Sequence, residues 1–415
     1  MLKKNKKLTF VSLLLSFSVI AQAASDEKNV VVLPKCLISD ITTNYKTFSS
    51  TNSLSLIETN EAGIDTLITA KNQHRATPCG GFIDVTEAWN KYNSKGIATK
   101  SSAKLFLDGY VHPVKHTLTK SPITYNIQYP NQVNQLLQTI NSQDIWENLA
   151  YFSDTSHDHF PDRYAGSNTG LKAAEWLASK VETMAKTNNR ADVTVYTVAT
   201  GTKYKQPSVV VKIGDSNEPG IVIGGHMDTL SGTKELKPGA DDDGSGSMTA
   251  MEVARILIYS GMHFKKPIYI IWYSAEELGL IGSGYVVKDF INKNIPVDAV
   301  LQLDMTGYSH KNDPTIWLIT DNVDNNLTNY LETLINSYVK TPVGRTRCGY
   351  SCSDHASWNK AGFPAAFPFE ADFNKDNPYI HTSQDTMDIL SLTHMTNFAK
   401  LATAFAVELA EPVVE

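Results

Sequence analysis

Residues 220–228 read GIVIGGHMD, a short apolar run that leads directly into a histidine and an aspartate. A second run, PIYIIWY at 267–273, leads into SAEE, and a third, VDAVLQL at 297–303, leads into Asp304. Short runs rich in β-branched and aromatic residues predict buried strands. The sequence therefore predicts three strands that each end in residues able to bind a metal.

Predicted helices alternate with these strands, which is typical of an α/β fold. We expect a mixed, largely parallel central sheet with helices on both faces. The remaining predicted strands are 208–213, 315–320 and 365–369, and the predicted helices are 133–149, 169–185, 247–259, 284–292, 322–339 and 389–409.

Ligands of open α/β sheets bind beyond the carboxyl ends of the strands, where the three runs deliver their polar residues. The loop PGADDDGSG at 238–246 adds three consecutive carboxylates, which repel one another unless a cation offsets them. A solvated acidic loop is the alternative, but the flanking glycines and the nearby His226 favour a metal site. His381, in PYIHT at 378–382, supplies a second candidate histidine.

The candidate ligands are two histidines and several carboxylates, a set that suits zinc and also manganese or cobalt. One catalytic zinc takes three protein ligands, so five candidates are enough for two metals that share a carboxylate. Glu276 and Glu277 are adjacent, and in an extended segment their side chains would point apart. One of them can then bind metal while the other acts as a general base.

A nucleophilic serine is a weaker alternative. GYSCS at 349–353 nearly matches the Gly-x-Ser-x-Gly motif and is followed by Asp354 and His355. The last glycine is missing, and no strand is predicted before the turn. Neither Gly-x-Gly-x-x-Gly nor a P-loop occurs elsewhere in the chain.

Residues 1–23 predict a signal peptide, because four lysines precede a short apolar run and AQA at 21–23 fits the cleavage rule. The apolar run is shorter than the roughly 20 residues that a membrane span needs. We therefore expect a secreted protein, exported through the periplasm, without a membrane anchor. Cleavage makes the formal charge more negative than −6, which disfavours nucleic-acid binding.

The four cysteines are expected to form disulfides in an oxidising compartment. They allow three pairings, of which the simplest joins Cys36 to Cys79 and Cys348 to Cys352. A four-cysteine zinc site is the alternative, but the two halves lie far apart and no Cys-x-x-Cys occurs.

The chain changes character near residue 130. Residues 24–130 are rich in Ser, Thr, Asn and Lys, show no long helical pattern and predict a small β-rich or mixed module. Three prolines within 111–130 indicate a linker. The predicted organisation is a signal peptide at 1–23, an N-terminal pro-region at 24–130 and a catalytic domain at 131–415.

Six ordered motifs resemble the zinc-dependent aminopeptidases of the bacterial leucyl aminopeptidase type, and the resemblance spans about residues 131–410. The motifs are GGHMD at 224–228, PGADDDGSG at 238–246, SAEELG at 274–279, QLDM at 302–305, CGYSCSDH at 348–355 and IHT at 380–382. The resemblance implies a phosphorylase/hydrolase-like fold with two Zn²⁺ per chain.

The resemblance also implies a role for each site residue. Asp242 would bridge both metals, with His226 and Asp304 completing one site. Glu277 and His381 would complete the other. Glu276 would act as the general base for the metal-bridging water. Asp228 would hold the ring of His226. Tyr350 would donate a hydrogen bond to the oxyanion, from within a loop closed by a Cys348–Cys352 disulfide.

The implied reaction removes the first residue from peptides with a free N-terminus, with a leucine-like apolar preference. Met305, Phe369, Phe373 and Ile380 would line the first-residue pocket. Asp376 stands where close relatives often carry an aromatic residue, which predicts tolerance for a basic first residue. The family habit of removable N-terminal segments implies a zymogen, and we expect a monomer.

Three other functions fit the same fold less well. A glutaminyl cyclase would work with one zinc, and a carboxypeptidase would require a free C-terminus. A non-catalytic binding module would be expected to lack ligands, whereas every ligand that the resemblance requires is present.

Overall fold

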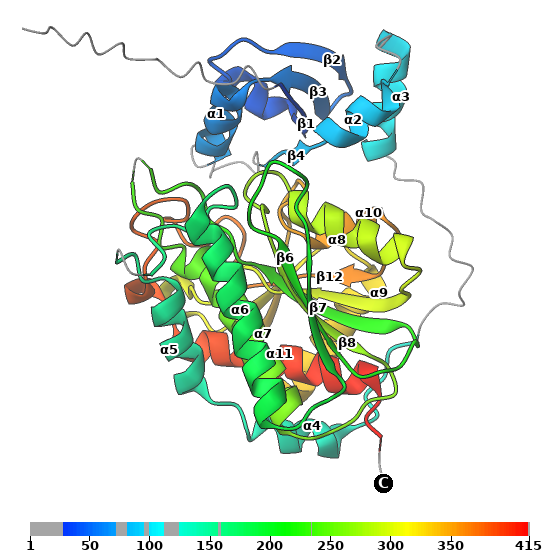
Figure 1. The fold of residues 1–415 in the computed structure, drawn as a ribbon, viewed down its shortest axis with the longest axis vertical. Coiled ribbons are helices and arrows are strands. Elements are labelled where there is room, and N and C mark those ends of the chain that lie inside the picture. Colours follow the sequence, from blue (N-terminus) through cyan, green and yellow to red (C-terminus); the bar gives the residue numbers. More distant parts are fainter. Residues whose placement is uncertain are drawn as a thin grey trace, which may run out of the picture.

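The computed structural model describes residues 28–71, 81–94, 99–111, 124–156, 159–233 and 235–413. Of these, the residues up to Val111 form a small N-terminal module, which lies against one end of a larger α/β domain formed by those from residue 124 onward (Figure 1). The predicted signal peptide lies outside the described residues. Within those ranges no helix combines the length and apolarity that crossing a bilayer requires.

A six-stranded sheet runs through the α/β domain in the order β12-β9-β7-β8-β6-β5. β7 pairs in parallel with β8 and β9, and β12 is parallel to β9, whereas β6 and β5 are antiparallel additions. This confirms the predicted mixed, largely parallel sheet. The strands are β5 (Val193–Val198), β6 (Ser208–Ile213), β7 (Gly220–His226), β8 (Ile268–Tyr273), β9 (Val297–Gln302) and β12 (Ala365–Ala366).

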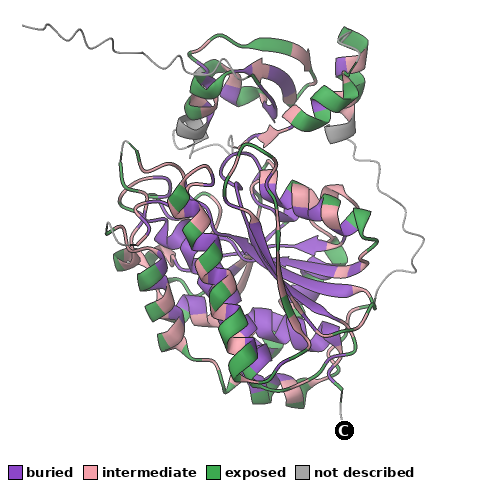
Figure 2. Cartoon of the chain, viewed as in Figure 1, coloured by how far each residue is buried: buried purple, intermediate pink, exposed green. Residues whose placement is uncertain are grey.

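Helices cover both faces of this sheet, as predicted, so its central strands are buried along their length (Figure 2). Alternate side chains of β6 and β7 reach opposite layers, with Val209 and Ile221 on one face and Val210 and Val222 on the other. The first face packs against α4 (Pro130–Leu137), α5 (Ser142–Phe152), α6 (Asn168–Thr187), α7 (Gly246–Tyr259), α9 (Asn325–Leu334) and α11 (Leu392–Ala410), and the second against α8 (Ile281–Asn292) and α10 (His355–Lys360).

Three parts of the α/β domain differ from the prediction. The helix predicted over 133–149 is two helices, because Asn141 caps α5 by accepting hydrogen bonds from the backbone N–H groups of the first turn. The helix predicted over 322–339 is α9 followed by a π-helical turn. The strand predicted over 365–369 is two short strands, and the second belongs to another sheet with the order β11-β10-β13. Its members are β10 (Ile316–Ile319), β11 (Val343–Thr346) and β13 (Pro368–Phe369).

The N-terminal module has its own four-stranded sheet, in the order β2-β3-β1-β4, and its own apolar clusters. Helices α1 and α3 are 11 and 12 residues long, which is ordinary for a helix, so the module is mixed, as predicted. Most of the predicted linker lies outside the described residues. The elements are β1 (Asn29–Pro34), β2 (Lys46–Ser50), β3 (Leu54–Thr59), α1 (Glu61–Lys71), β4 (Ile83–Asp84), α2 (Thr86–Tyr92) and α3 (Lys100–Val111).

Candidate metal centre

The carboxyl ends of three neighbouring strands bring histidine and carboxylate side chains together. β7 ends at His226, β8 leads into the turn that carries Glu276 and Glu277, and β9 leads to Asp304. β7 is the parallel neighbour of both β8 and β9, so these ends lie side by side. The side chains they deliver are all buried.

Asp242 lies between two histidines that come from distant parts of the chain. Its Oδ1 atom is 3.0 Å from His226 Nε2, and its Oδ2 atom is 3.0 Å from His381 Nε2. Two sets of ligand atoms result, each lying within 4.8 Å of one another. The first set comprises His226, Asp242 and Asp304, and the second comprises Asp242, Glu277 and His381.

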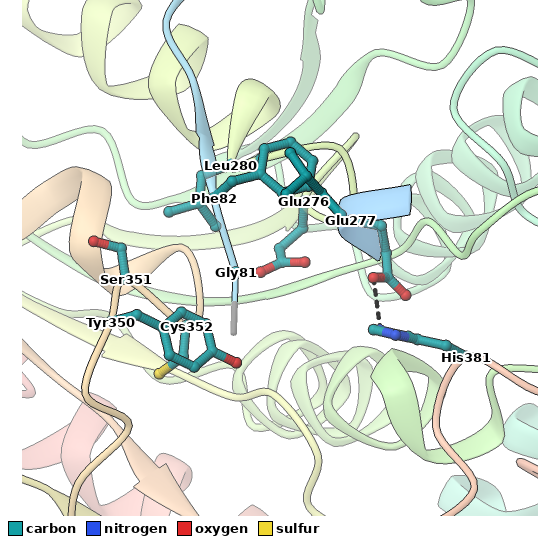
Figure 3. Close-up of a pocket in the computed structure, with 11 residues that line it drawn as sticks. Gly81, Phe82, Glu276, Glu277, Leu280, Tyr350, Ser351, Cys352 and His381 are labelled. Atoms are coloured by element: carbon teal, nitrogen blue, oxygen red, sulfur yellow. Dashed lines mark ion pairs between the residues drawn. The ribbon is translucent and has the colours of Figure 1, made fainter. Parts of the chain in front are cut away.

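The donor atoms fit a metal such as zinc. Each set offers one imidazole and two carboxylates, which are ligands that zinc accepts. Asp304 Oδ1 is buried, accepts no hydrogen bond from any described residue and lies 3.7 Å from His226 Nε2. In the second set, His381 Nε2 lies 2.8 Å from Glu277 Oε2 (Figure 3). A cation would satisfy these converging oxygens.

The electrostatics of the site follow from burial and close charges. Burial raises the pKa of Asp242, but hydrogen bonds from His226 and His381 outweigh it and hold that pKa well below its usual range. Burial lowers the pKa of His226, but the carboxylates of Asp304 and Asp228 raise it well above its usual range. The site therefore favours an ionised Asp242 carboxylate with positive charge beside it.

Glu276 and Glu277 lie in a tight turn and not in the extended segment that we expected. Ala275 has a left-handed φ of 53°, and the N–H groups of Gly279 and Leu280 donate to the Glu276 carbonyl at 2.9 Å. The two side chains nevertheless diverge: Glu277 points toward His381, and Glu276 lies across the pocket from Tyr350 (Figure 3).

Asp228 joins the end of β7 to this turn. It accepts hydrogen bonds from the N–H groups of Glu276 at 3.0 Å and Glu277 at 3.3 Å. Its Oδ1 atom is 3.5 Å from His226 Nδ1. Asp228 therefore orients the glutamate turn and also faces the histidine ring.

Sequence reasoning missed Asp243, the last carboxylate of the acidic triplet. Its carboxylate accepts hydrogen bonds from the N–H groups of His226 at 3.0 Å, Gly246 at 2.8 Å and Met305 at 3.1 Å. Burial, followed by the charge of Asp304, raises its pKa well above its usual range. Asp243 therefore ties two ligand segments to the start of α7.

Asp385 and Asn377 were missed as well, because nothing in their spacing marks them. Asp385 accepts hydrogen bonds from the N–H groups of Asp241 and Asp242, both at 3.1 Å. Asn377 Nδ2 donates to Asp385 at 3.0 Å and to Asp241 at 3.1 Å. These two residues fasten the loop that carries His381 to the loop that carries Asp242.

Arg163 is the buried cation beneath this centre, and it too was missed. Its side chain donates to the carbonyls of Met227 at 2.8 Å, Pro238 at 2.6 Å and Gly239 at 2.8 Å. Burial lowers its pKa to about 10, against the opposing effect of nearby Asp385 and Asp243. It therefore remains charged at neutral pH.

Three non-glycine residues at or beside the candidate ligands have a left-handed backbone. Besides Ala275, Met305 has a φ of 56° and His381 a φ of 64°. A non-glycine residue held in this region costs about 1–3 kcal/mol, so the surroundings must enforce it. At Met305, the hydrogen bond from its backbone N–H to Asp243 at 3.1 Å contributes to this.

The five residues predicted to line a first-residue pocket lie around one cavity beside the metal centre. Cys352 and Phe367 also line it, and of these two only Phe367 was not predicted. The predicted members are Met305, Phe369, Phe373, Asp376 and Ile380, and the cavity also contacts Asp242, Glu276, Asp304 and Tyr350.

Cys348 and Cys352 form a disulfide that closes the loop around Tyr350. Cys36 is also disulfide-bonded, but its predicted partner, Cys79, lies outside the described residues. The same loop carries the Gly-x-Ser-like stretch, before which no strand was predicted. Strand β11 does precede the loop, so that prediction was wrong. Ser353 donates to Asp304 Oδ2 at 2.5 Å and thus supports a candidate metal ligand.

Comparisons with known proteins point in one direction. Residues 208–406 match peptidase family M28. A probable leucine aminopeptidase of Arthroderma otae is 38% identical over 315 residues, which cover 74% of this chain and 85% of that protein.

Two solved structures from Legionella pneumophila are similar over most of the chain. The LapA aminopeptidase has a TM-score of 0.83 and 44% identity, covering 94% of this chain and 100% of its own. LapB has a TM-score of 0.82 and 40% identity, covering 93% and 100%. Both alignments are long enough to extend into the N-terminal module.

Proposed function

The chain belongs to peptidase family M28 and is a metal-dependent aminopeptidase, and on that premise we propose that it uses two zinc ions and acts outside the cell. The observation that carries the two-metal proposal is Asp242, whose two oxygens each lie 3.0 Å from a different histidine. One carboxylate placed in this way suits a bridge between paired metals.

The residues present would hold the zinc ions in two groups around Asp242. His226 and Asp304 would hold one, and Glu277 and His381 the other. Zinc bound there would supply a Lewis acid, which would polarise the scissile carbonyl and lower the pKa of water.

The chain's own residues supply the remaining chemistry. Glu276 takes a proton from the attacking water and passes it to the leaving amine. The Tyr350 hydroxyl donates a hydrogen bond to the oxygen that becomes negatively charged. Glu277 and Asp304 attract the free α-amine, which limits the reaction to the first peptide bond.

Metal titration tests this proposal. Removal of metal by a chelator is expected to abolish hydrolysis of leucinamide, and two equivalents of zinc per chain are expected to restore it. Metal content is measured on the same samples by atomic emission. Full restoration by one equivalent contradicts the paired site, and hydrolysis of N-acetylated peptides with a free C-terminus contradicts exopeptidase action at the N-terminus.

The substrates proposed are peptides that begin with leucine or a similar apolar residue, in keeping with the aromatic and aliphatic cavity. Asp376 modifies this preference, because a carboxylate at the cavity attracts a basic side chain. Replacing Asp376 with alanine is expected to lower kcat/KM for lysyl relative to leucyl amides roughly fivefold, the effect of about 1 kcal/mol of charge attraction. Asp376→Asn, which keeps the shape, should match it; an unchanged ratio in both rules out a charge effect.

We further propose that residues 1–23 are removed on export and that the N-terminal module is a pro-region. The module contributes Leu67, Gly81 and Phe82 to a cavity that also contains Glu276 and His381, which supports a blocking role. Intact mass of the protein recovered from culture medium measures both cleavages. Full activity toward leucyl peptides in protein that retains residues 24–130 contradicts the inhibitory pro-region.

A further inference from the structure

Two cavities meet at Glu276, and they differ in what lines them. The first-residue cavity contains Met305 and Ile380, and no described residue of the N-terminal module lines it. The second cavity contains Glu277, Gly279 and Leu280 together with module residues. Both share Glu276, Tyr350 and Cys352, so the proposed catalytic groups stand at the junction.

Each cavity can therefore bind a different part of the substrate. If the first side chain occupies the cavity beside Met305, the scissile bond lies at Glu276. The peptide that leaves must then continue into the cavity beside Gly279. This assignment rests on the proposed function.

The module already places a short peptide segment in that second cavity. The Asp84 N–H group donates to the Gly279 carbonyl at 3.2 Å. The ring of Phe82 lies over Gly279, where an added Cβ would come within 3.1 Å of it. Gly81 sits against Tyr350 and beside Glu276 (Figure 3). An added Cβ at Gly81 would lie 2.2 Å from the Tyr350 ring, so only glycine fits.

These contacts are of the kind that any extended peptide can make. A hydrogen bond between a backbone N–H and a backbone carbonyl carries little sequence information, because side chains do not take part. The Gly279 carbonyl and the Tyr350 ring therefore offer a site for backbone that the module and a leaving peptide would use in the same way.

A polar contact outside both cavities holds the module in place. Glu87 on α2 accepts hydrogen bonds from Lys288 at 2.8 Å and from the Tyr285 hydroxyl, both on α8. These partners lower the pKa of Glu87, so the contact is charged at neutral pH. Because the pair is exposed, it can be broken without disturbing the metal centre.

We propose that the cavity lined by Gly279, Leu280 and Tyr350 binds the leaving part of the peptide, and that the N-terminal module blocks this cavity while the first-residue cavity stays accessible. The full chain then hydrolyses substrates with a large leaving group less efficiently than substrates with a small one. Leucinamide, which releases only ammonia, needs no room there, whereas a leucyl peptide does.

The test compares leucinamide with the peptide Leu-Gly-Gly-Phe in the zinc-loaded full chain, residues 24–415. The variant Glu87→Lys should release the module by repulsion from Lys288 and by loss of the hydrogen bond from Tyr285. We expect kcat/KM for the peptide to rise roughly tenfold or more, and that for leucinamide to change less than about twofold. Asp108→Lys, which reverses a charge on α3 away from the contact, should change neither.

Three results would overturn the inference or its premise. An equal rise for both substrates means that the module blocks the whole site and has no leaving-group selectivity. No rise for either, in a variant whose module has become accessible to protease, means that the module does not compete with peptide. Absence of leucinamide hydrolysis in every form, wild type included, contradicts instead the proposed catalytic chemistry.

Discussion

Replacing Glu276 with alanine is expected to lower kcat roughly 10²–10⁴-fold while both sets of candidate metal ligands remain intact. Glu276 belongs to neither set of converging ligand atoms, yet it lines both cavities at their junction. Its backbone is held by Asp228 at 3.0 Å, so truncation of the side chain leaves the turn in place. The loss should therefore fall on proton transfer and not on folding or metal binding.

Glu276→Gln is the matched control, because it keeps the size of the side chain but cannot accept the proton. It should lose nearly as much kcat as the alanine variant, with an unchanged zinc content and thermal midpoint. Hydrolysis of leucinamide and metal content are measured together. Activity that survives either substitution removes Glu276 as the base, and a loss explained by missing zinc assigns it to metal binding.

Replacing Arg163 with methionine is expected to lower the free energy of unfolding by about 3 kcal/mol or more, because each buried carbonyl that loses its hydrogen-bond donor costs about 1–3 kcal/mol. The guanidinium is 0% exposed and is hydrogen-bonded to carbonyls on both loops that lead to the metal centre. Removal leaves those carbonyls without a donor and leaves Asp385 and Asp243 without a nearby positive charge. Methionine fills similar space, so the loss reports mainly on polar contacts.

Arg345→Met is the surface control for this experiment. Arg345 pairs with Glu332 at 2.6 Å, with 42% of each side chain exposed, so its loss should cost less than about 1 kcal/mol. Urea unfolding of both variants, with zinc held constant, gives the comparison. Similar losses for the two variants would contradict a special role for Arg163, and Arg163→Lys should recover only part of the stability because lysine cannot reproduce the forked geometry.

The sequence predicts the central strands well because their patterns are local. The apolar run before His226 and the run before the glutamates are short, β-branched and bounded by turns. The same stretch of sequence therefore predicts both the strand and the site residues at its end. Asp243, Asp385 and Arg163 could not be found in this way. Each acts on backbone N–H or carbonyl groups of distant segments, and such groups leave no mark in the sequence.

Two other predictions failed because local interactions override the pattern of apolar residues. Asn141 caps a helix within a run that looks continuous. The left-handed Ala275 turns the chain where an extended segment was expected. The seating of the N-terminal module depends on surfaces that exist only after both parts have folded, so no pattern in residues 24–130 could reveal it.

The residues that surround Asp242 come from segments that are distant along the chain, from His226 to His381. Metal held between such segments acts as a reversible cross-link, because the unfolded chain has no comparable site. The free energy of binding therefore adds to the free energy of folding in proportion to the logarithm of free zinc. The lifetime of this protein against proteolysis should then increase with the concentration of free zinc around it. Scarce zinc would lower the amount of enzyme as well as its activity.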